Sequence, residues 1–132
     1  KARAAARGGD WKESEAIALI AADTVVHVDD KTALGKPRST EDARSMLAML
    51  VGKPHRVSTA YAIVAPGETQ AAAVELRTTT VEFQPLDDAA IDAYVETGEP
   101  FDKAGAYAIQ GQASAFVRRI FPSVMCSSRS SR

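Results

Sequence analysis

The sequence predicts an α/β protein in which a mixed, twisted sheet is flanked by helices. Three observations predict this class. The aliphatic run at 17–28 and the segments 57–64 and 72–83 have the composition of strands, whereas 40–51 repeats its apolar residues at helical spacing. These elements alternate without a regular strand–helix–strand order, which favours a mixed sheet over a purely parallel one.

Composition limits the classes of function. A chain of 132 residues with 45% hydrophobic and 25% charged residues is typical of one globular domain. A net charge of -1 argues against general affinity for nucleic acid or anionic membrane. The single cysteine, Cys126, excludes an intrachain disulfide, and there is no apolar run of membrane-spanning length or secretory signal. We therefore expect a cytoplasmic protein.

The first strand carries an unusual carboxylate. The run 17–28 reads IALIAADTVVHV, and Asp23 and Thr24 interrupt residues typical of a strand buried on both faces. An ionised carboxylate in such a run is costly unless a metal, a cation or hydrogen-bond donors meet it. Two interpretations stay open here: Asp23 ends a strand and caps a turn, or the strand delivers its carboxylate into a cleft.

A hairpin turn at 29–31 and a helix follow. Ser39 and Asp42 match a capping box after Pro37, and Gly52 is a stop signal, so we expect a helix between them. One face of that helix is apolar and is predicted to enter the core: Ala43, Met46, Leu47, Leu50 and Val51.

The middle of the chain predicts a β-hairpin and a second helix. The segments 57–64 and 72–83 flank a Pro66-Gly67 turn, and the second alternates between an expected covered face (Val74, Leu76, Thr78, Thr80) and a wet one. Asp87 or Asp88 is then expected to cap a helix with Ile91, Tyr94 and Val95 on its buried face.

The last third is harder to assign. Residues 99–112 are dense in Gly and charge and match no regular element, whereas 114–120 is strand-like. The tail 122–132 is Ser/Arg-rich and is expected to be disordered, and residues 1–7 resemble the end of a helix.

Charged side chains with tight-turn neighbours make up the candidate chemistry. Asp23, Glu99 and Asp102 offer carboxylates for a divalent cation, and Lys36 and Lys103 offer ammonium groups for phosphate. Each also has an ordinary structural explanation, as a turn with a solvated lysine or as a surface ion-pair cluster.

As a set, these motifs resemble the Maf family of nucleoside triphosphate pyrophosphatases. The resemblance covers residues 1–121 and rests on AADTVV, LGKP, GEP, DKAGAY and IQG in that order. It implies a Maf/Ham1 (ITPase-like) fold of two lobes with a nucleotide cleft, a homodimer, a nucleoside triphosphate as substrate, and Mg or Mn as cofactor.

The resemblance also implies roles for residues. Asp23 matches the family's catalytic acid, a proton acceptor near the metal, and Lys36 and Lys103 match lysines that face the triphosphate. Glu99 and Asp102 match acidic positions of the same cleft and are further candidate metal ligands beside Asp23. The implied reaction is attack of water on the α-phosphate, which releases pyrophosphate.

Two positions are associated with substrate choice. Thr24 and Gln110 match the family branch that acts on dTTP and UTP. A glutamine amide can donate to a pyrimidine O4 and accept from N3–H, a two-point match for thymine or uracil. His27 and His55 could serve as acid–base groups, but without a readable partner we interpret both as structural.

Both ends depart from the family pattern. The family's opening strand, its Ser-rich Pro-Arg-Arg phosphate loop and a metal-binding glutamate precede the first residue here, and 122–132 diverges from the family's closing segment. The alternative is therefore a catalytically impaired nucleotide-binding or regulatory fragment of the family. A nucleic-acid-binding module using 103–132 ranks lower, because that region has little aromatic surface.

Overall fold

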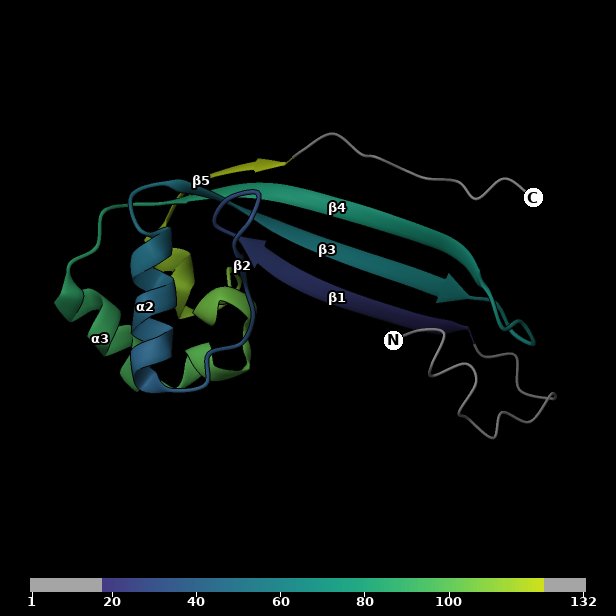
Figure 1. Cartoon of the computed structure of the whole chain (residues 1–132), viewed down its shortest axis with the longest axis horizontal. Coiled ribbons are helices and arrows are strands. Elements are labelled where there is room, and N and C mark those ends of the chain that lie inside the picture. The colour runs from purple at the N-terminus through teal and green to yellow at the C-terminus, as the bar shows by residue number, and fades with distance from the viewer. Residues whose placement is uncertain (1–17, 123–132) are drawn as a thin grey trace. The chain divides into compact units, whose positions relative to one another are not determined.

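The computed structural model describes residues 18–122 and confirms the predicted α/β class. Its strands form one five-stranded sheet in the order β2-β1-β3-β4-β5 (Figure 1). In the described residues the sheet is antiparallel rather than mixed, with the β1–β2 and β4–β5 pairs running in opposite directions. Two α-helices, α2 and α3, and three short 3₁₀ segments complete the described chain.

The first hairpin forms as expected. Strand β1 (Leu19–His27) pairs with β2 (Ala33–Leu34), and Val26 lies opposite Leu34. The Asp29 carboxylate accepts hydrogen bonds from the backbone N–H groups of Lys31 and Thr32, at 2.8 and 2.7 Å. These donors lower the pKa of Asp29, since they favour its charged form.

Helix α2 (Thr40–Leu50) begins at the predicted cap. The Ser39 hydroxyl accepts from the N–H of Asp42 at 3.1 Å, and the Asp42 carboxylate accepts in return from the N–H of Arg38 at 2.9 Å. Gly52 follows the helix with a φ of +73°, a conformation that favours glycine. The predicted apolar face is confirmed: Ala43, Met46, Leu47 and Leu50 are buried, and Val51 is half-buried against them.

The second hairpin and the second helix also match the sequence pattern. Strands β3 (Pro54–Val64) and β4 (Ala71–Phe83) are neighbours, and β4 pairs with β5 (Val117–Pro122), with an irregularity in register between Glu82 and Phe83. Helix α3 (Asp88–Glu96) is capped by Asp87, whose carboxylate accepts from the N–H of Ala90 at 2.8 Å. An ion pair joins Arg44 of α2 to Asp92 of α3 at 2.7 Å.

The described residues fall into two compact units. Residues 18–24 and 59–77 belong to the first, and 25–58 and 78–122 belong to the second. The hydrophobic core lies in the second unit, where both α-helices pack against the sheet residues of that unit. Its largest fully buried aliphatic and phenyl side chains are Phe83, Leu47, Leu50, Val26 and Val81. Stability is therefore concentrated in the second unit.

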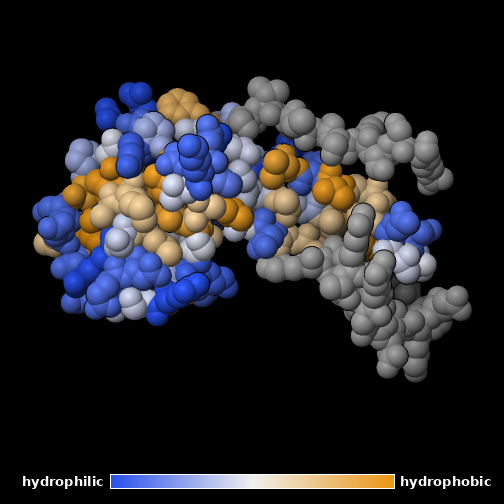
Figure 2. Space-filling model, viewed as in Figure 1, coloured by the Kyte–Doolittle hydropathy of each residue, from blue (hydrophilic) through white to orange (hydrophobic). Residues whose placement is uncertain are grey.

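The first unit keeps large apolar side chains exposed. Ile20 is 66% exposed, and Val74 and Leu76 are each 50% exposed. Figure 2 shows hydrophobic residues at the surface over this region of β1, β3 and β4. The expectations that β1 is buried on both faces and that Val74 and Leu76 lie on a covered face are therefore wrong, since the described helices all belong to the second unit.

His55 is a core residue, as interpreted from the sequence. Its side chain is 1% exposed, its Nε2 lies 2.6 Å from the Tyr107 hydroxyl, and its ring packs edge-on against Phe83 and Tyr107 at centroid distances of 4.9 and 5.5 Å. Burial lowers its pKa from 6.5 to about 4, against a weaker opposing effect of the Lys53 backbone. The ring is therefore neutral at pH 7.

This burial predicts an acid-dependent loss of stability. The unfolded histidine binds a proton near pH 6.5 and the folded one only near pH 4, so stability falls as the pH drops between these values. Urea titrations are expected to show a loss of about 1.2 kcal/mol between pH 6 and 5. His55→Asn should flatten this slope, and NMR titration of the His55 ring measures its pKa directly. A ring that titrates near pH 6.5 in the folded protein would contradict the prediction.

Two sequence expectations lie outside the described residues. These are the helix end at 1–7 and, beyond Pro122 at the end of β5, the disordered tail. No helix within 18–122 combines the length and the apolar character that crossing a membrane requires.

Candidate functional site

The unassigned stretch after α3 folds as a chain of 3₁₀ turns. Its segments are η1 (Glu99–Asp102), η2 (Ala104–Ala106) and η3 (Gln112–Phe116). Gly98 and Gly105 adopt φ values of +78° and +69°, and Pro100 sits in the first turn of η1. Because 3₁₀ turns are short and lack the helical apolar period, the sequence pattern could not reveal them.

The Gly-Lys-Pro turn lies against this stretch. The N–H of Gly105 donates to the carbonyl oxygen of Gly35 at 2.9 Å, so the backbone before Lys36 contacts the turn after Lys103. A Cβ atom on Gly105 would lie 2.9 to 3.0 Å from three side-chain carbon atoms of Val26 in β1. The close approach of three segments thus depends on a glycine at this position.

Lys36, Asp102 and Lys103 form one charge cluster in the second unit. The Lys103 ammonium donates to the Asp102 carboxylate at 2.9 Å, and this contact lowers the pKa of Asp102, with a smaller contribution from the charge of Lys36. Asp102 is 72% exposed and Lys103 is 39% exposed. The cluster therefore presents two ammonium groups, one of them paired, to an incoming anion.

The Glu99 carboxylate accepts hydrogen bonds from nearby groups of the protein. Its Oε1 accepts from the Tyr94 hydroxyl at 2.9 Å, and its Oε2 accepts from the N–H of Gln112 at 3.1 Å. The Gln112 N–H is the main cause of a lowered pKa for Glu99, and the Tyr94 hydroxyl adds to it. Burial together with this carboxylate raises the pKa of Tyr94. Glu99 is thus an ionised acceptor inside the loop.

Gln110 lies at the surface, two residues before the Gln112 N–H that binds this carboxylate. It occupies a turn in which the N–H of Gly111 donates to the carbonyl of Ala108 at 3.0 Å, and its side chain is exposed. The structure places Gln110 in the same unit as Lys36 and Lys103. An exposed amide on a hydrogen-bonded turn is suited to reading a polar ligand edge.

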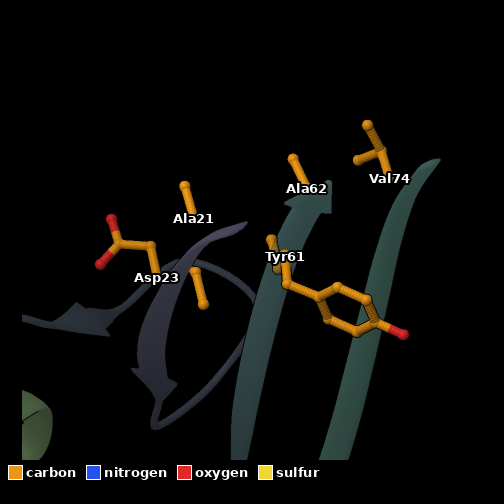
Figure 3. A pocket seen from close by; sticks show the side chains of 7 residues that line it. Ala21, Asp23, Tyr61, Ala62 and Val74 are labelled. Carbon is orange, nitrogen blue, oxygen red and sulfur yellow. The ribbon is translucent and has the colours of Figure 1, made fainter. Parts of the chain in front are cut away.

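Asp23 and Thr24 lie on β1 in the first unit. Asp23 is exposed and lines a pocket of about 190 Å³ with small side chains, Tyr61 and Val74 (Figure 3). In Figure 3 the Asp23 carboxylate points away from the Tyr61 ring. An exposed carboxylate on a strand is what delivery into a cleft requires, and Asp23 is not at the strand end, so the turn-cap interpretation is wrong.

Thr24 has a partner that the sequence did not reveal. Its hydroxyl lies 2.8 Å from the hydroxyl of Thr59 on β3. This contact restricts the rotation of the Thr24 side chain, so Thr59 belongs with the candidate site residues of the first unit. Sequence reasoning missed Thr59 because pairing across strands depends on register, which a single strand pattern leaves open.

The candidate residues are thus divided between the units. Lys36, Asp102, Lys103, Glu99 and Gln110 are brought into one unit. Asp23 and Thr24 belong to the other.

The described side chains include few groups that could bind a metal ion together. Within residues 18–122 no group of three or more His, Cys, Asp and Glu side chains is arranged to hold a metal ion. Both Glu99 oxygens accept hydrogen bonds, from Tyr94 on α3 and from Gln112, and Asp102 is paired with Lys103.

Comparison with a family model and with curated proteins points to one family. The family model described as Maf-like protein matches residues 1–125. Curated proteins named dTTP/UTP pyrophosphatase from Desulfotalea psychrophila and Thermococcus gammatolerans are each 50% identical over 102 residues, covering 77% of this chain and 51% and 53% of their own lengths. A protein of the same name from Burkholderia pseudomallei is 48% identical over 121 residues, covering 91% of this chain and 54% of its own length. The chain spans about half the length of the curated relatives it matches.

Proposed function

The chain belongs to the Maf-like protein family, and we propose that it acts in the hydrolysis of nucleoside triphosphates to the monophosphate and pyrophosphate. We propose dTTP and UTP as the preferred substrates, because relatives about half identical to this chain carry the name dTTP/UTP pyrophosphatase. The observation that carries the proposal is the charge cluster of Lys36, Asp102 and Lys103, which brings together two cations from segments far apart in the sequence.

The two lysines would bind the triphosphate. Pyrophosphate is a highly charged leaving group, so fixed ammonium groups that meet it favour the transition state over the ground state. The pairing of Lys103 with Asp102 holds the ammonium in place before substrate arrives. The exposure of both side chains leaves them accessible to phosphate oxygens.

Asp23 would act on the attacking water. An exposed carboxylate on a strand can accept a proton from water or orient it toward the α-phosphorus, where a new P–O bond forms as the bond to pyrophosphate breaks. Gln110 would donate to O4 and accept from N3–H of thymine or uracil. Thr24, whose hydroxyl lies 2.8 Å from that of Thr59, is proposed as a second residue that influences substrate choice.

A divalent metal ion, Mg or Mn, is proposed as cofactor on the basis of the family resemblance. Such an ion commonly takes one or two carboxylates and completes its shell with water and phosphate oxygens. Asp23 is the proposed protein ligand, with Asp102 as a further candidate. The sequence also offered Glu99, but both of its carboxylate oxygens already accept hydrogen bonds from the protein. A homodimer and a cytoplasmic location are likewise proposals.

The proposed function is tested by measuring pyrophosphate release. The assay uses dTTP, UTP, dCTP and dGTP, each with Mg or Mn and with EDTA. Release from dTTP and UTP above the other two, lost in EDTA, is the expected result. No release from any of the four nucleotides would contradict the proposal.

A further inference from the structure

The Glu99 carboxylate connects helix α3 to the backbone that follows Gln110, the residue proposed to recognise the base. One oxygen accepts from the Tyr94 hydroxyl on α3 at 2.9 Å, and the other accepts from the Gln112 backbone at 3.1 Å. Helix α3 is anchored in the core through Ile91, Tyr94 and Val95. Glu99 therefore ties the backbone that follows Gln110 to a rigid helix.

Gly111 shows how closely the carboxylate approaches this backbone. A Cβ atom built on Gly111 would overlap Oε1, Oε2 and the carboxyl carbon of Glu99. The φ of Gly111 is −103°, which any residue can adopt. Glycine at this position is thus explained by the carboxylate beside it rather than by the backbone conformation.

The turn that carries Gln110 is fixed on both sides. The N–H of Gly111 donates to Ala108 and the N–H of Ser114 donates to Gly111, each at 3.0 Å. Between these bonds lies the contact of Gln112 with Glu99. The Gln110 side chain itself is exposed, and these contacts hold the backbone from which it extends.

We infer that Glu99 is a positioning residue for base recognition, which fixes the Gln110 turn through Gln112 and Gly111 and does not serve as a metal ligand. The inference rests on the proposed function, since it assigns Gln110 to the base. It differs from the acidic metal-binding role that the family resemblance suggested for Glu99. Both carboxylate oxygens are already engaged by donors of the protein, and a cation would have to displace those donors.

The main test replaces the carboxylate by its nearest isostere. Glu99→Gln keeps the shape of the side chain but exchanges one accepting oxygen for an amide that donates, so it cannot accept from Tyr94 and Gln112 at the same time. We expect the ratio of kcat/KM for dTTP to that for dGTP to fall about ten-fold or more. The metal concentration for half-maximal activity should stay unchanged.

Two further variants alter the partners of the Glu99 carboxylate instead of Glu99 itself. Gly111→Ala forces the carboxylate and the loop apart and should lower the same ratio. Tyr94→Phe removes one hydrogen bond while keeping the aromatic packing, and should lower the ratio by less. Glu96→Gln, which removes a negative charge from an exposed position on α3, is the matched control and should leave the ratio unchanged.

The outcomes separate the inference from its premise. An inactive wild-type protein would overturn the proposed function and the inference with it. An active wild type whose Glu99→Gln and Gly111→Ala variants keep the dTTP to dGTP ratio would overturn the positioning role alone. A raised metal requirement in Glu99→Gln, with the ratio unchanged, would also overturn it in favour of metal binding. Should Glu99→Gln fail to fold, Tyr94→Phe decides by the same ratio.

Discussion

Asp23→Asn is expected to lower kcat for dTTP hydrolysis by about a thousand-fold while the protein remains folded. The amide has nearly the shape of the carboxylate but cannot accept a proton from water, so the chemical step loses its base. Because the Asp23 side chain is exposed on β1, the free energy of unfolding should change by only about 0.5 kcal/mol. Single-turnover assays together with urea denaturation measure the two effects separately.

Asp30→Asn is the matched control for this prediction. It removes the same charge from an exposed residue whose surface ion pair with Arg56 contributes little to stability. Normal turnover is expected for Asp30→Asn. If Asp23→Asn retained wild-type kcat, Asp23 would have no part in the chemical step, and the proposed mechanism would be wrong.

Gly105→Ala is expected to cost about 3 kcal/mol of folding free energy. Two effects add at this position: a φ of +69°, which strains a residue with a side chain, and a Cβ atom placed 2.9 Å from Cγ2 of Val26. Valine in a strand has few alternative rotamers, so it cannot easily move away. The substitution should also weaken nucleotide binding, since the Gly105 to Gly35 hydrogen bond holds the turn before Lys36.

Gly52→Ala separates the two effects. Gly52 has a φ of +73° but open space where a Cβ would lie, so its substitution should cost about 1 kcal/mol from backbone strain alone. Val26→Ala combined with Gly105→Ala should cost less than the sum of the single changes, because the shortened side chain relieves the clash. Equal costs for Gly105→Ala and Gly52→Ala would show that contact with Val26 is unimportant.

Much of the fold could be predicted because local chemistry determines it. The Ser39 and Asp87 caps, the apolar face of α2 and the turn at Asp29 each depend on residues a few positions apart, and each is confirmed. The candidate residues Asp23, Lys36, Lys103 and Gln110 came from motifs whose spacing in the chain resembles a known family. The sequence gives the chemical character of these residues, but it does not show which residues contact them in the folded protein.

The sequence by itself determined the α/β class, the order of the two α-helices and the longer strands, and the membership of the family that the comparison confirms. Only the tertiary structure decided which charges meet: that Asp102 pairs with Lys103 near Lys36, that Thr59 contacts Thr24, and that Glu99 holds the loop beside Gln110. It also decided that Val74 and Leu76 are exposed, against the alternation of their strand. The physical reason is the same throughout. Helix caps and periodicity are local, whereas contacts across strands and turns depend on register and packing, which no single segment encodes.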